Sequence, residues 1–395
     1  MSERIEIQDF ALWKKLKESR ALISFDLEIT ARCNNDCRHC YIGLSADDPT
    51  AKAVELAKDE ILSLASEAAG MGALWCLLTG GEPLLRNDFN EIYRGLKRLG
   101  LLVSVFTNAC LVTPAHVRLF RRYPPRDVEV TVYGASRETY ERVTRRAGSY
   151  DAFLRGLDLL LDGGVPVRLK AMALRSNVHE LELISAFCRR RTKDFFRFDP
   201  LLHLRYDGDE ARNAGIMAER LLPQEIVAIE RADDERSISL QKGLREGGLI
   251  NPLFEHYGCD HLFHCGAGSG SFTLSSDGTF RLCSALWHPE AVVSVRPGTP
   301  GALSVREAWE QWVPHVRDLR GANPAFLGKC RKCALINLCL WCPAHAALET
   351  GEMDGWVQYF CDVANARSKA LVAVCPEPMG QGAAEEPRPL RGRDS

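Results

Sequence analysis

The chain has 395 residues, enough for two or three domains, and is 46% apolar, enough to bury a substantial core. Fifty basic against 52 acidic residues give a net charge of −2, which argues against a broad surface for nucleic acid or anionic lipid. No stretch approaches about 18 consecutive apolar residues, so a membrane span is excluded. The N-terminus is too charged for a secretory signal, and a cytoplasmic protein is expected.

From residue 21 to about residue 200, short strand-like runs alternate with helical stretches. The predicted strands are 21–30, 73–80, 101–108, 128–133, 165–173 and 195–200. The predicted helices are 55–70, 88–99, 114–122, 150–163 and 178–191. Six β-then-α units imply parallel strands, because each crossover needs a helix. The predicted fold class is therefore α/β, closed as a barrel or partial barrel.

The two faces of these strands differ in polarity. Phe25 and Leu27, for example, alternate with Asp26. If the apolar face meets the helices, the polar face lines a solvated or ligand-filled interior. Five charged residues are therefore predicted to face a polar ligand: Glu28, Glu129, Arg168, Lys170 and Arg197. The alternative is that they form ion pairs at the strand ends.

The rest of the chain shows no second run of βα units. Residues 205–250 are charged and predicted to be helical, and TLSSDGTFRLC (273–283) predicts a hairpin around Asp277-Gly278. The tail is rich in Pro, Gly and charge and is expected to be disordered. The predicted organisation is an N-terminal segment (1–20), a barrel (21–204), a helical connector (205–250), a cysteine-rich domain (251–375) and the tail (376–395).

Fifteen cysteines in a chain without an export signal indicate metal ligands or catalytic thiols before disulfides. Cys33, Cys37 and Cys40 follow the first strand directly, at the barrel mouth where such enzymes place their chemistry. Three thiolates this close can hold three irons of a [4Fe–4S] cluster and leave the fourth iron open for a substrate group. A zinc site would need a fourth ligand, for which His39 is poorly placed.

The second strand ends in the turn Thr79-Gly80-Gly81-Glu82-Pro83. Glycines let the backbone approach a ligand closely, and the proline fixes the turn. Because this turn lies at the same barrel mouth as the cysteine triplet, it suits the binding of an amino-acid moiety beside the cluster.

Through the CxxxCxxC motif, the GGEP motif and the six βα units, residues 21–200 resemble the radical S-adenosylmethionine (SAM) superfamily. The resemblance implies a partial, TIM-like (β/α)6 barrel and reductive cleavage of SAM to a 5′-deoxyadenosyl radical that abstracts a substrate hydrogen. It implies five SAM-binding residues: His39 at the adenine, Gly80, Gly81 and Glu82 at the methionine end, and Thr131. Tyr133 stands where the family commonly has an acidic residue.

Eight further cysteines between 259 and 361 are too many for one metal and enough for two clusters. The run 330–342 alone also fits a zinc ribbon. The whole set resembles the SPASM extension, a small domain of short hairpins and helices with two auxiliary [4Fe–4S] clusters that would carry electrons. The resemblance implies two ligand sets: Cys259, Cys265, Cys283 and Cys342 for the nearer cluster, and Cys330, Cys333, Cys339 and Cys361 for the farther one. Two residues separate Cys339 from Cys342, where the family usually has three.

The resemblance implies a radical SAM oxidoreductase, and the favoured substrate is a peptide or protein side chain. Ser284 stands where sulfatase-maturing members generally have an acidic residue. The alternatives are oxidation of a small metabolite and a non-enzymatic iron–sulfur or zinc scaffold or electron carrier. Because only 32 residues precede Cys33, a peptide substrate is expected to need a separate carrier protein or recognition by the C-terminal region. A flavodoxin- or ferredoxin-type reductant is expected, and nucleic acid and membrane partners are not.

Overall fold

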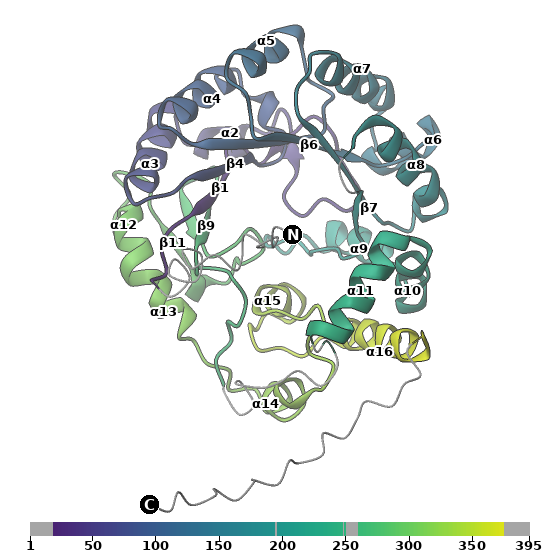
Figure 1. Ribbon diagram of the computed structural model, residues 1–395. Helices are drawn as coiled ribbons and strands as arrows, with labels where there is room; N and C mark the ends of the chain where they lie inside the picture. The colour runs from purple at the N-terminus through teal and green to yellow at the C-terminus, as the bar shows by residue number, and fades with distance from the viewer. Residues whose placement is uncertain (1–18, 194–195, 248, 250–259, 375–395) are drawn as a thin grey trace, which may run out of the picture.

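The described residues (19–193, 196–247, 249 and 260–374) are organised around a nine-stranded sheet in the computed structural model (Figure 1). The sheet order is β11-β10-β9-β1-β4-β5-β6-β7-β8. Its strands are β1 (Ser24–Glu28), β4 (Trp75–Thr79), β5 (Leu102–Thr107), β6 (Asp127–Val132), β7 (Val167–Met172), β8 (Arg197–Asp199), β9 (Ser271–Leu274), β10 (Thr279–Arg281) and β11 (Val292–Ser294). From β1 to β8 all neighbours are parallel, which confirms the predicted α/β class.

Helices follow the parallel strands and form an arc around their outer face (Figure 1). They are α2 (Pro49–Val54), α3 (Lys58–Gly70), α4 (Phe89–Arg98), α5 (Pro114–Arg122), α6 (Arg137–Thr144), α7 (Ser149–Asp162) and α8 (Leu181–Arg191). Helix α6 was not predicted from the sequence, because its eight residues are mostly polar and carry too short an apolar stripe. Ser136 begins this helix by accepting a hydrogen bond from the Thr139 N–H at 3.2 Å.

The apolar faces of the strands meet this helical layer. Phe25, Leu27, Val128 and Val130 are all at most 1% exposed. The polar residues that alternate with them must therefore face the other side of the sheet. This is the arrangement that the alternation predicted.

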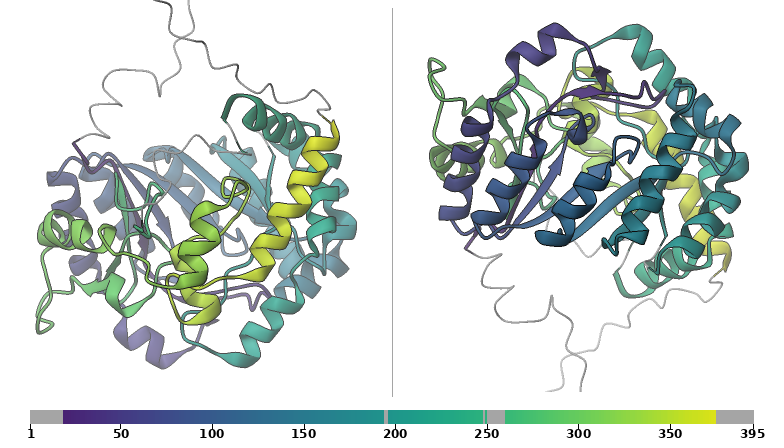
Figure 2. Two further views of the ribbon diagram at one scale, coloured as in Figure 1. Left: turned by 90° about the horizontal axis from the view of Figure 1, so that it is seen from below. Right: turned by 90° about the horizontal axis from the view of Figure 1, so that it is seen from above.

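The C-terminal half adds to the same sheet and covers its open side. Strand β9 pairs in parallel with β1, and β9 and β10 form the predicted hairpin, in which Gly278 has φ +87°. The remaining helices are α9 (Glu210–Ala218), α10 (Pro223–Ala232), α11 (Asp234–Gly247), α12 (Val305–Glu307), α13 (Val313–Arg317), α14 (Pro324–Gly328), α15 (Pro343–Thr350) and α16 (Gln358–Val374). Seen from below, α15 and α16 lie across the barrel opening (Figure 2, left).

The domain boundaries inferred from the sequence stay predictions. Hydrogen bonds between β1 and β9 join the parts of the chain on either side of the boundary predicted at residue 251. The predicted tail (376–395) and residues 1–18 of the N-terminal segment lie outside the described residues. Within the described part of the chain, no helix combines the length and apolar character needed to cross a membrane.

A stack of three phenylalanines joins the hairpin to β1 and yields a first prediction. Phe272 lies with ring centroids 5.6 Å from Phe25 and 4.6 Å from Phe280, and all three are buried. Phe272→Ala should lower the free energy of unfolding by about 3–5 kcal/mol, because it removes a packed ring and leaves a cavity. Denaturant unfolding measures this loss. A loss no larger than that of Phe272→Leu would contradict the packing role.

Candidate functional site

Cys33, Cys37 and Cys40 lie in one loop at the carboxyl edge of the parallel strands, beyond the end of β1. Cys37 is buried, and the other two thiols are partly buried. The N–H of Asn35 lies 3.4 Å from the Cys33 Sγ, and the N–H of Gly43 lies 3.0 Å from the Cys40 Sγ. Donors of this kind stabilise thiolate ligands of iron–sulfur clusters.

The pKa shifts of two thiols in this loop indicate that a positively charged centre would stabilise their thiolate forms. Burial raises the pKa of Cys37, and the thiols of Cys40 and Cys33 raise it further. Burial also raises the pKa of Cys33, with smaller contributions from Glu82 and Cys40. Thiols in this setting stay protonated at neutral pH unless a metal centre binds them as thiolates. The donor set therefore fits an iron–sulfur cluster.

The end of α6 fixes the outer side of the cysteine loop. The N–H of Asp36 donates to the carbonyl of Thr144, and that of Arg38 to the carbonyl of Val143, both at 3.0 Å. Arg145 follows α6 in the left-handed region, with φ 51°, and its Nε donates to the Asp36 carbonyl at 2.8 Å. A non-glycine residue in this conformation is held there by its surroundings.

The Gly80-Gly81 turn, at the end of β4, packs against the segment that enters the cysteine loop. The N–H of Gly81 donates to the Thr30 carbonyl at 2.7 Å, and the N–H of Glu82 to the Arg32 carbonyl at 2.9 Å. A Cβ would lie 2.2 Å from the Thr30 oxygen at Gly80, where φ is +136°, and 2.3 Å from the Arg32 oxygen at Gly81. Both glycines are thus required by the close approach of the chain's own backbone.

The buried carboxylate of Glu82 joins the ends of β4 and β5. It accepts hydrogen bonds from the Thr107 hydroxyl at 2.7 Å, the Asn108 N–H at 2.7 Å and the Leu84 N–H at 3.0 Å. Burial raises the pKa of Glu82 to about 7, against the lowering effect of these hydrogen bonds. In the structure its side chain orders the barrel mouth, and its contact with SAM is still a prediction.

His39 and Tyr133 lie beside the three thiols, with ring centroids 5.2 Å apart. Burial lowers the pKa of His39 to about 4, and its enclosed Nδ1 lacks a hydrogen-bond partner in the described chain. Such an atom is unusual and fits a site completed by a ligand. Tyr133 hydrogen-bonds with Cys37 and with Thr131. From the sequence, Tyr133 stood out only as a departure from the family, although its position two residues after Thr131 pointed to this place.

The described C-terminal cysteines form two groups. In the first, burial and then the thiols of Cys283 and Cys265 raise the pKa of Cys342 to about 11. These three belong to the set implied for the nearer cluster. Its fourth member, Cys259, lies outside the described residues, as does Cys375.

The second group joins the segment around η6 (Cys330–Lys332) to α16. Burial raises the pKa of Cys339 to about 12, and the thiols of Cys361, Cys330 and Cys333 add to the rise. Burial and then Cys361 and Cys333 likewise raise the pKa of Cys330 to about 11. The structure thus brings together all four thiols implied for the farther cluster.

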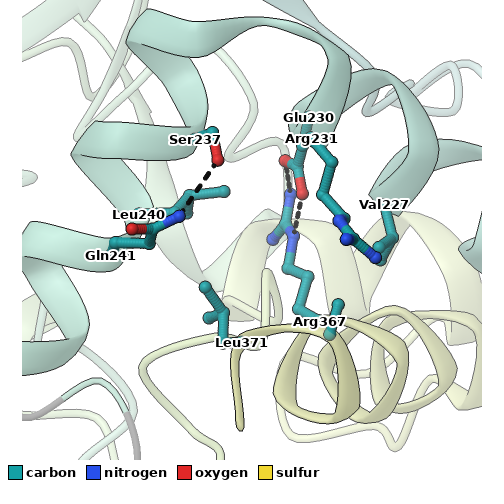
Figure 3. Close-up of a pocket in the computed structure, with 9 residues that line it drawn as sticks. Val227, Glu230, Arg231, Ser237, Leu240, Gln241, Arg367 and Leu371 are labelled. Atoms are coloured by element: carbon teal, nitrogen blue, oxygen red, sulfur yellow. Dashed lines mark hydrogen bonds and ion pairs between the residues drawn. The ribbon is translucent and has the colours of Figure 1, made fainter. Parts of the chain in front are cut away.

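A buried ion pair between α10 and α16 supports this second group (Figure 3). The Arg367 Nε and Nη2 donate to the Glu230 carboxylate at 2.9 and 2.6 Å, and its Nη1 donates to the Leu338 carbonyl at 3.2 Å. Leu338 directly precedes Cys339. The helical connector is therefore linked through two buried charges to the backbone of a candidate ligand.

Across the described residues, no three His, Cys, Asp or Glu side chains converge closely enough to hold a single metal ion. A mononuclear zinc site requires such convergence. In a [4Fe–4S] cluster, by contrast, each thiolate binds a different iron, so the sulfurs stand farther apart.

Arg281, which was not predicted from the sequence as a functional residue, is a fully buried charge at the hairpin. It binds Glu28 at 2.6 Å, donates to the Ser284 carbonyl at 2.6 Å and lies 3.6 Å from the ring centroid of Trp287. Tyr41 hydrogen-bonds with Ser284, and so links the two cysteine-bearing loops. The sequence offered one indication of this role: Arg281 stands in an otherwise apolar run, two residues before the candidate ligand Cys283.

The other charges predicted to face a ligand also have partners. Glu129 binds Lys170 and lies 2.9 Å from Arg197, and Arg168 lies 3.7 Å from Asp127. Glu129, Arg168 and Arg197 line a cavity of about 260 Å³ beside the amino-terminal part of the strands. These contacts are ion pairs, the alternative inferred for these charges from the sequence. That the same side chains bind a ligand stays a prediction.

Two histidines connect the segment after β8 to α15. The Nδ1 of His203 lies 2.7 Å from the Nε2 of His345, whose own Nδ1 lies 3.1 Å from the Leu340 carbonyl. Since a carbonyl only accepts, His345 carries its proton on Nδ1, and His203 donates to it. Burial lowers the pKa of His203 to about 3, so this pair is neutral at physiological pH.

The close contact at Gly81 leads to a second prediction. Gly81→Ala should lower the free energy of unfolding by about 1–3 kcal/mol, because the added Cβ meets backbone that cannot move aside. The matched control is Gly70→Ala at the end of α3, where a Cβ would meet nothing within 4 Å. Thermal unfolding compares the two variants, and equal stability would contradict the requirement for glycine.

The buried His203 predicts a pH dependence of stability. Below about pH 6.5 the unfolded chain binds a proton at this residue and the folded chain does not, until the pH approaches 3. Lowering the pH from about 7.5 to about 5.5 should therefore remove about 1.4 kcal/mol of stability through His203. Denaturant unfolding at both pH values measures it. His203→Gln should reduce the loss, and His315→Gln, at an exposed histidine, should keep it. An unchanged loss in His203→Gln would contradict the prediction.

Sequence comparisons agree with this geometry. Residues 27–187 match the Radical SAM superfamily. An AdoMet-dependent heme synthase of Methanosarcina barkeri is 27% identical over 347 residues, 82% of this chain and 92% of that protein. A probable GTP 3′,8-cyclase of Saccharolobus islandicus is 34% identical over 301 residues, 70% of this chain and 86% of that protein.

Solved structures share the fold. Streptococcus suis SuiB bound to S-adenosylmethionine has a TM-score of 0.64 at 14% identity, covering 88% of this chain and 80% of that one. Native anSMEcpe with bound AdoMet has a TM-score of 0.60 at 13% identity, covering 90% of this chain and all of that one (100%). With the cysteine loop and Gly-Gly turn at one barrel mouth, these matches establish a SAM-dependent enzyme with [4Fe–4S] chemistry: the chain belongs to the radical SAM superfamily.

Proposed function

We propose that the chain is a radical SAM oxidoreductase of the SPASM type that removes a hydrogen atom from a side chain of a peptide or protein. The observation that carries the proposal is the gathering of the described C-terminal thiols into two groups beside the barrel. A radical SAM enzyme that needed only the cleavage of SAM would have no use for these groups. Fully ligated auxiliary clusters suit the transfer of a second electron.

Three ligand sets follow from this proposal. Cys33, Cys37 and Cys40 would hold the SAM-binding cluster. The auxiliary clusters would be held by Cys259, Cys265, Cys283 and Cys342, and by Cys330, Cys333, Cys339 and Cys361. The gathering of the described thiols into two groups supports the two auxiliary sets.

Around the first cluster, the chain's own residues would bind and orient SAM. When bound, SAM and the reduced cluster supply one-electron cleavage of a C–S bond and the means to remove a hydrogen atom. We assign His39 to the adenine, since its enclosed Nδ1 lacks a partner in the described chain. The backbone of Gly80 and Gly81 and the residue Glu82 would face the methionine end, and Thr131 would complete the site.

Two kinds of substrate have support. Structures of the same fold include SuiB bound to precursor peptide SuiA and anSMEcpe with a Kp18Cys peptide, which supports a peptide or protein substrate. The second candidate is a small metabolite, supported by the heme synthase that matches 82% of this chain. We further propose that a flavodoxin- or ferredoxin-type protein supplies the electrons and that a separate carrier protein presents a peptide substrate. The enzyme would work in a reducing cytoplasm.

The cysteine loop provides the test of the chemistry. Replacement of Cys33, Cys37 and Cys40 by Ala should abolish release of 5′-deoxyadenosine from SAM and leave about eight of about twelve irons, because only one cluster is lost. Iron analysis and chromatography of the reduced, reconstituted protein measure both. Loss of all iron, or SAM cleavage that persists, would contradict the assignment.

A separate experiment decides between the substrate classes. Cell extract is divided into a macromolecular and a small-molecule fraction, and each is added to the reduced enzyme with SAM. Stimulation of 5′-deoxyadenosine release by the macromolecular fraction alone, lost after protease treatment, is expected for a peptide or protein. Stimulation by the small-molecule fraction alone would favour the metabolite.

A further inference from the structure

Trp356 connects the protein surface to a candidate ligand of the farther cluster. Its side chain is 39% exposed, and its indole Nε1–H donates to the Cys361 Sγ at 3.0 Å. The Lys329 ammonium lies 4.3 Å from the ring centroid. A single exposed aromatic residue is ordinary, but one that reaches from solvent to a sulfur in a thiol group is not.

The loop that carries Trp356 is held by specific contacts. The buried Gly355 accepts a hydrogen bond at its carbonyl from the Trp341 indole at 2.8 Å. Asp354 accepts the N–H of Ala322 at 2.8 Å. The position of the exposed indole is therefore built by the fold, as expected of a functional contact.

Exposed lysines lie on the segment that contacts this indole. Lys329 and Lys332 are exposed, and together with Arg331 they flank Cys330 and Cys333 in the sequence Lys-Cys-Arg-Lys-Cys. Two exposed lysines on this segment, one of them over the exposed indole ring, suit a partner with an acidic surface, whereas Arg331 is buried against Phe326.

We propose that Trp356 and Lys329 form the contact through which the farther cluster exchanges electrons with an acidic one-electron carrier protein. The inference rests on the proposed function, because it takes Cys361 as a cluster ligand. An oxidation that starts with loss of a hydrogen atom must also release one electron and one proton from the substrate. The auxiliary clusters, if held by these thiols, would pass the electron to the oxidised carrier, which would be reduced by one electron, and the proton would leave to solvent.

The indole hydrogen bond also has an electrostatic consequence. An N–H donor stabilises the sulfur more strongly when the cluster carries the additional electron, so it raises the reduction potential. Trp356→Phe keeps the ring and removes the donor. It should shift the potential of the farther cluster to a more negative value, without loss of iron.

A redox titration followed by electron paramagnetic resonance measures this shift. The matched control is Trp312→Phe, which makes the same chemical change at a tryptophan whose indole N–H has no hydrogen-bond partner in the described chain. A negative shift in Trp356→Phe and none in Trp312→Phe is the expected result. Equal potentials in all three proteins would overturn the role of the indole.

Charge reversal tests the docking surface. Lys329→Glu should lower the rate of electron exchange with an acidic ferredoxin or flavodoxin about tenfold at low ionic strength, because electrostatic steering is lost. Lys193→Glu, an exposed site at the end of α8, is the control. Reduction by dithionite, a small reductant, should be the same in both. Equal rates with the carrier in the two variants would overturn the proposed surface.

Iron content separates the two levels of inference. If the wild-type protein lacks the farther cluster, the proposed ligand set fails and this inference fails with it. If the cluster is present but neither Trp356→Phe nor Lys329→Glu has its expected effect, only this inference fails.

Discussion

Three thiols enclosed within a single short loop are the constraint on which the site depends. Burial, with smaller contributions from neighbouring groups, raises the pKa of Cys37 and of Cys33, so these two thiols stay protonated unless a metal centre binds them. The protein supports that state through backbone N–H donors to the sulfurs, the end of α6 on one side of the loop and the Gly80-Gly81 turn on the other. The N–H donors hold the sulfurs themselves, and the other two supports hold the backbone of the loop and of the segment that enters it.

The same β1 that leads into the cysteine loop also pairs with β9 of the C-terminal region. Since parallel pairing fixes register, the hairpin cannot slide without disturbing the strand that leads into the cysteine loop. The buried Glu28–Arg281 pair adds a charge contact between the same two elements. In the proposed function, electron transfer would depend on a fixed separation of the clusters, and this shared sheet would maintain that separation.

Much of this arrangement could be predicted from local pattern. Alternating polarity located the parallel strands, Asp277-Gly278 located the hairpin, and cysteine spacing separated the loop triplet from the C-terminal set. Helix α6 could not be predicted, because tertiary packing rather than an apolar stripe stabilises it. Ion pairs between residues far apart in the chain, such as Arg281 with Glu28 or Arg367 with Glu230, could not be predicted, because they produce no periodic pattern in the sequence. The polar strand faces predicted charges inside the barrel, but which charge meets which depends on register.

Those interior charges are better understood as coupled sets than as separate binding groups. Glu129 is buried between Lys170 and Arg197, so removal of either cation leaves the carboxylate partly unneutralised in a poorly solvated place. An unpaired buried charge costs several kcal/mol, more than the intact set contributes to stability. Single substitutions there would therefore disturb β6, β7 and β8 together and imitate the loss of a ligand contact. The effects of paired substitutions, which need not add, distinguish a structural ion pair from a residue that binds substrate.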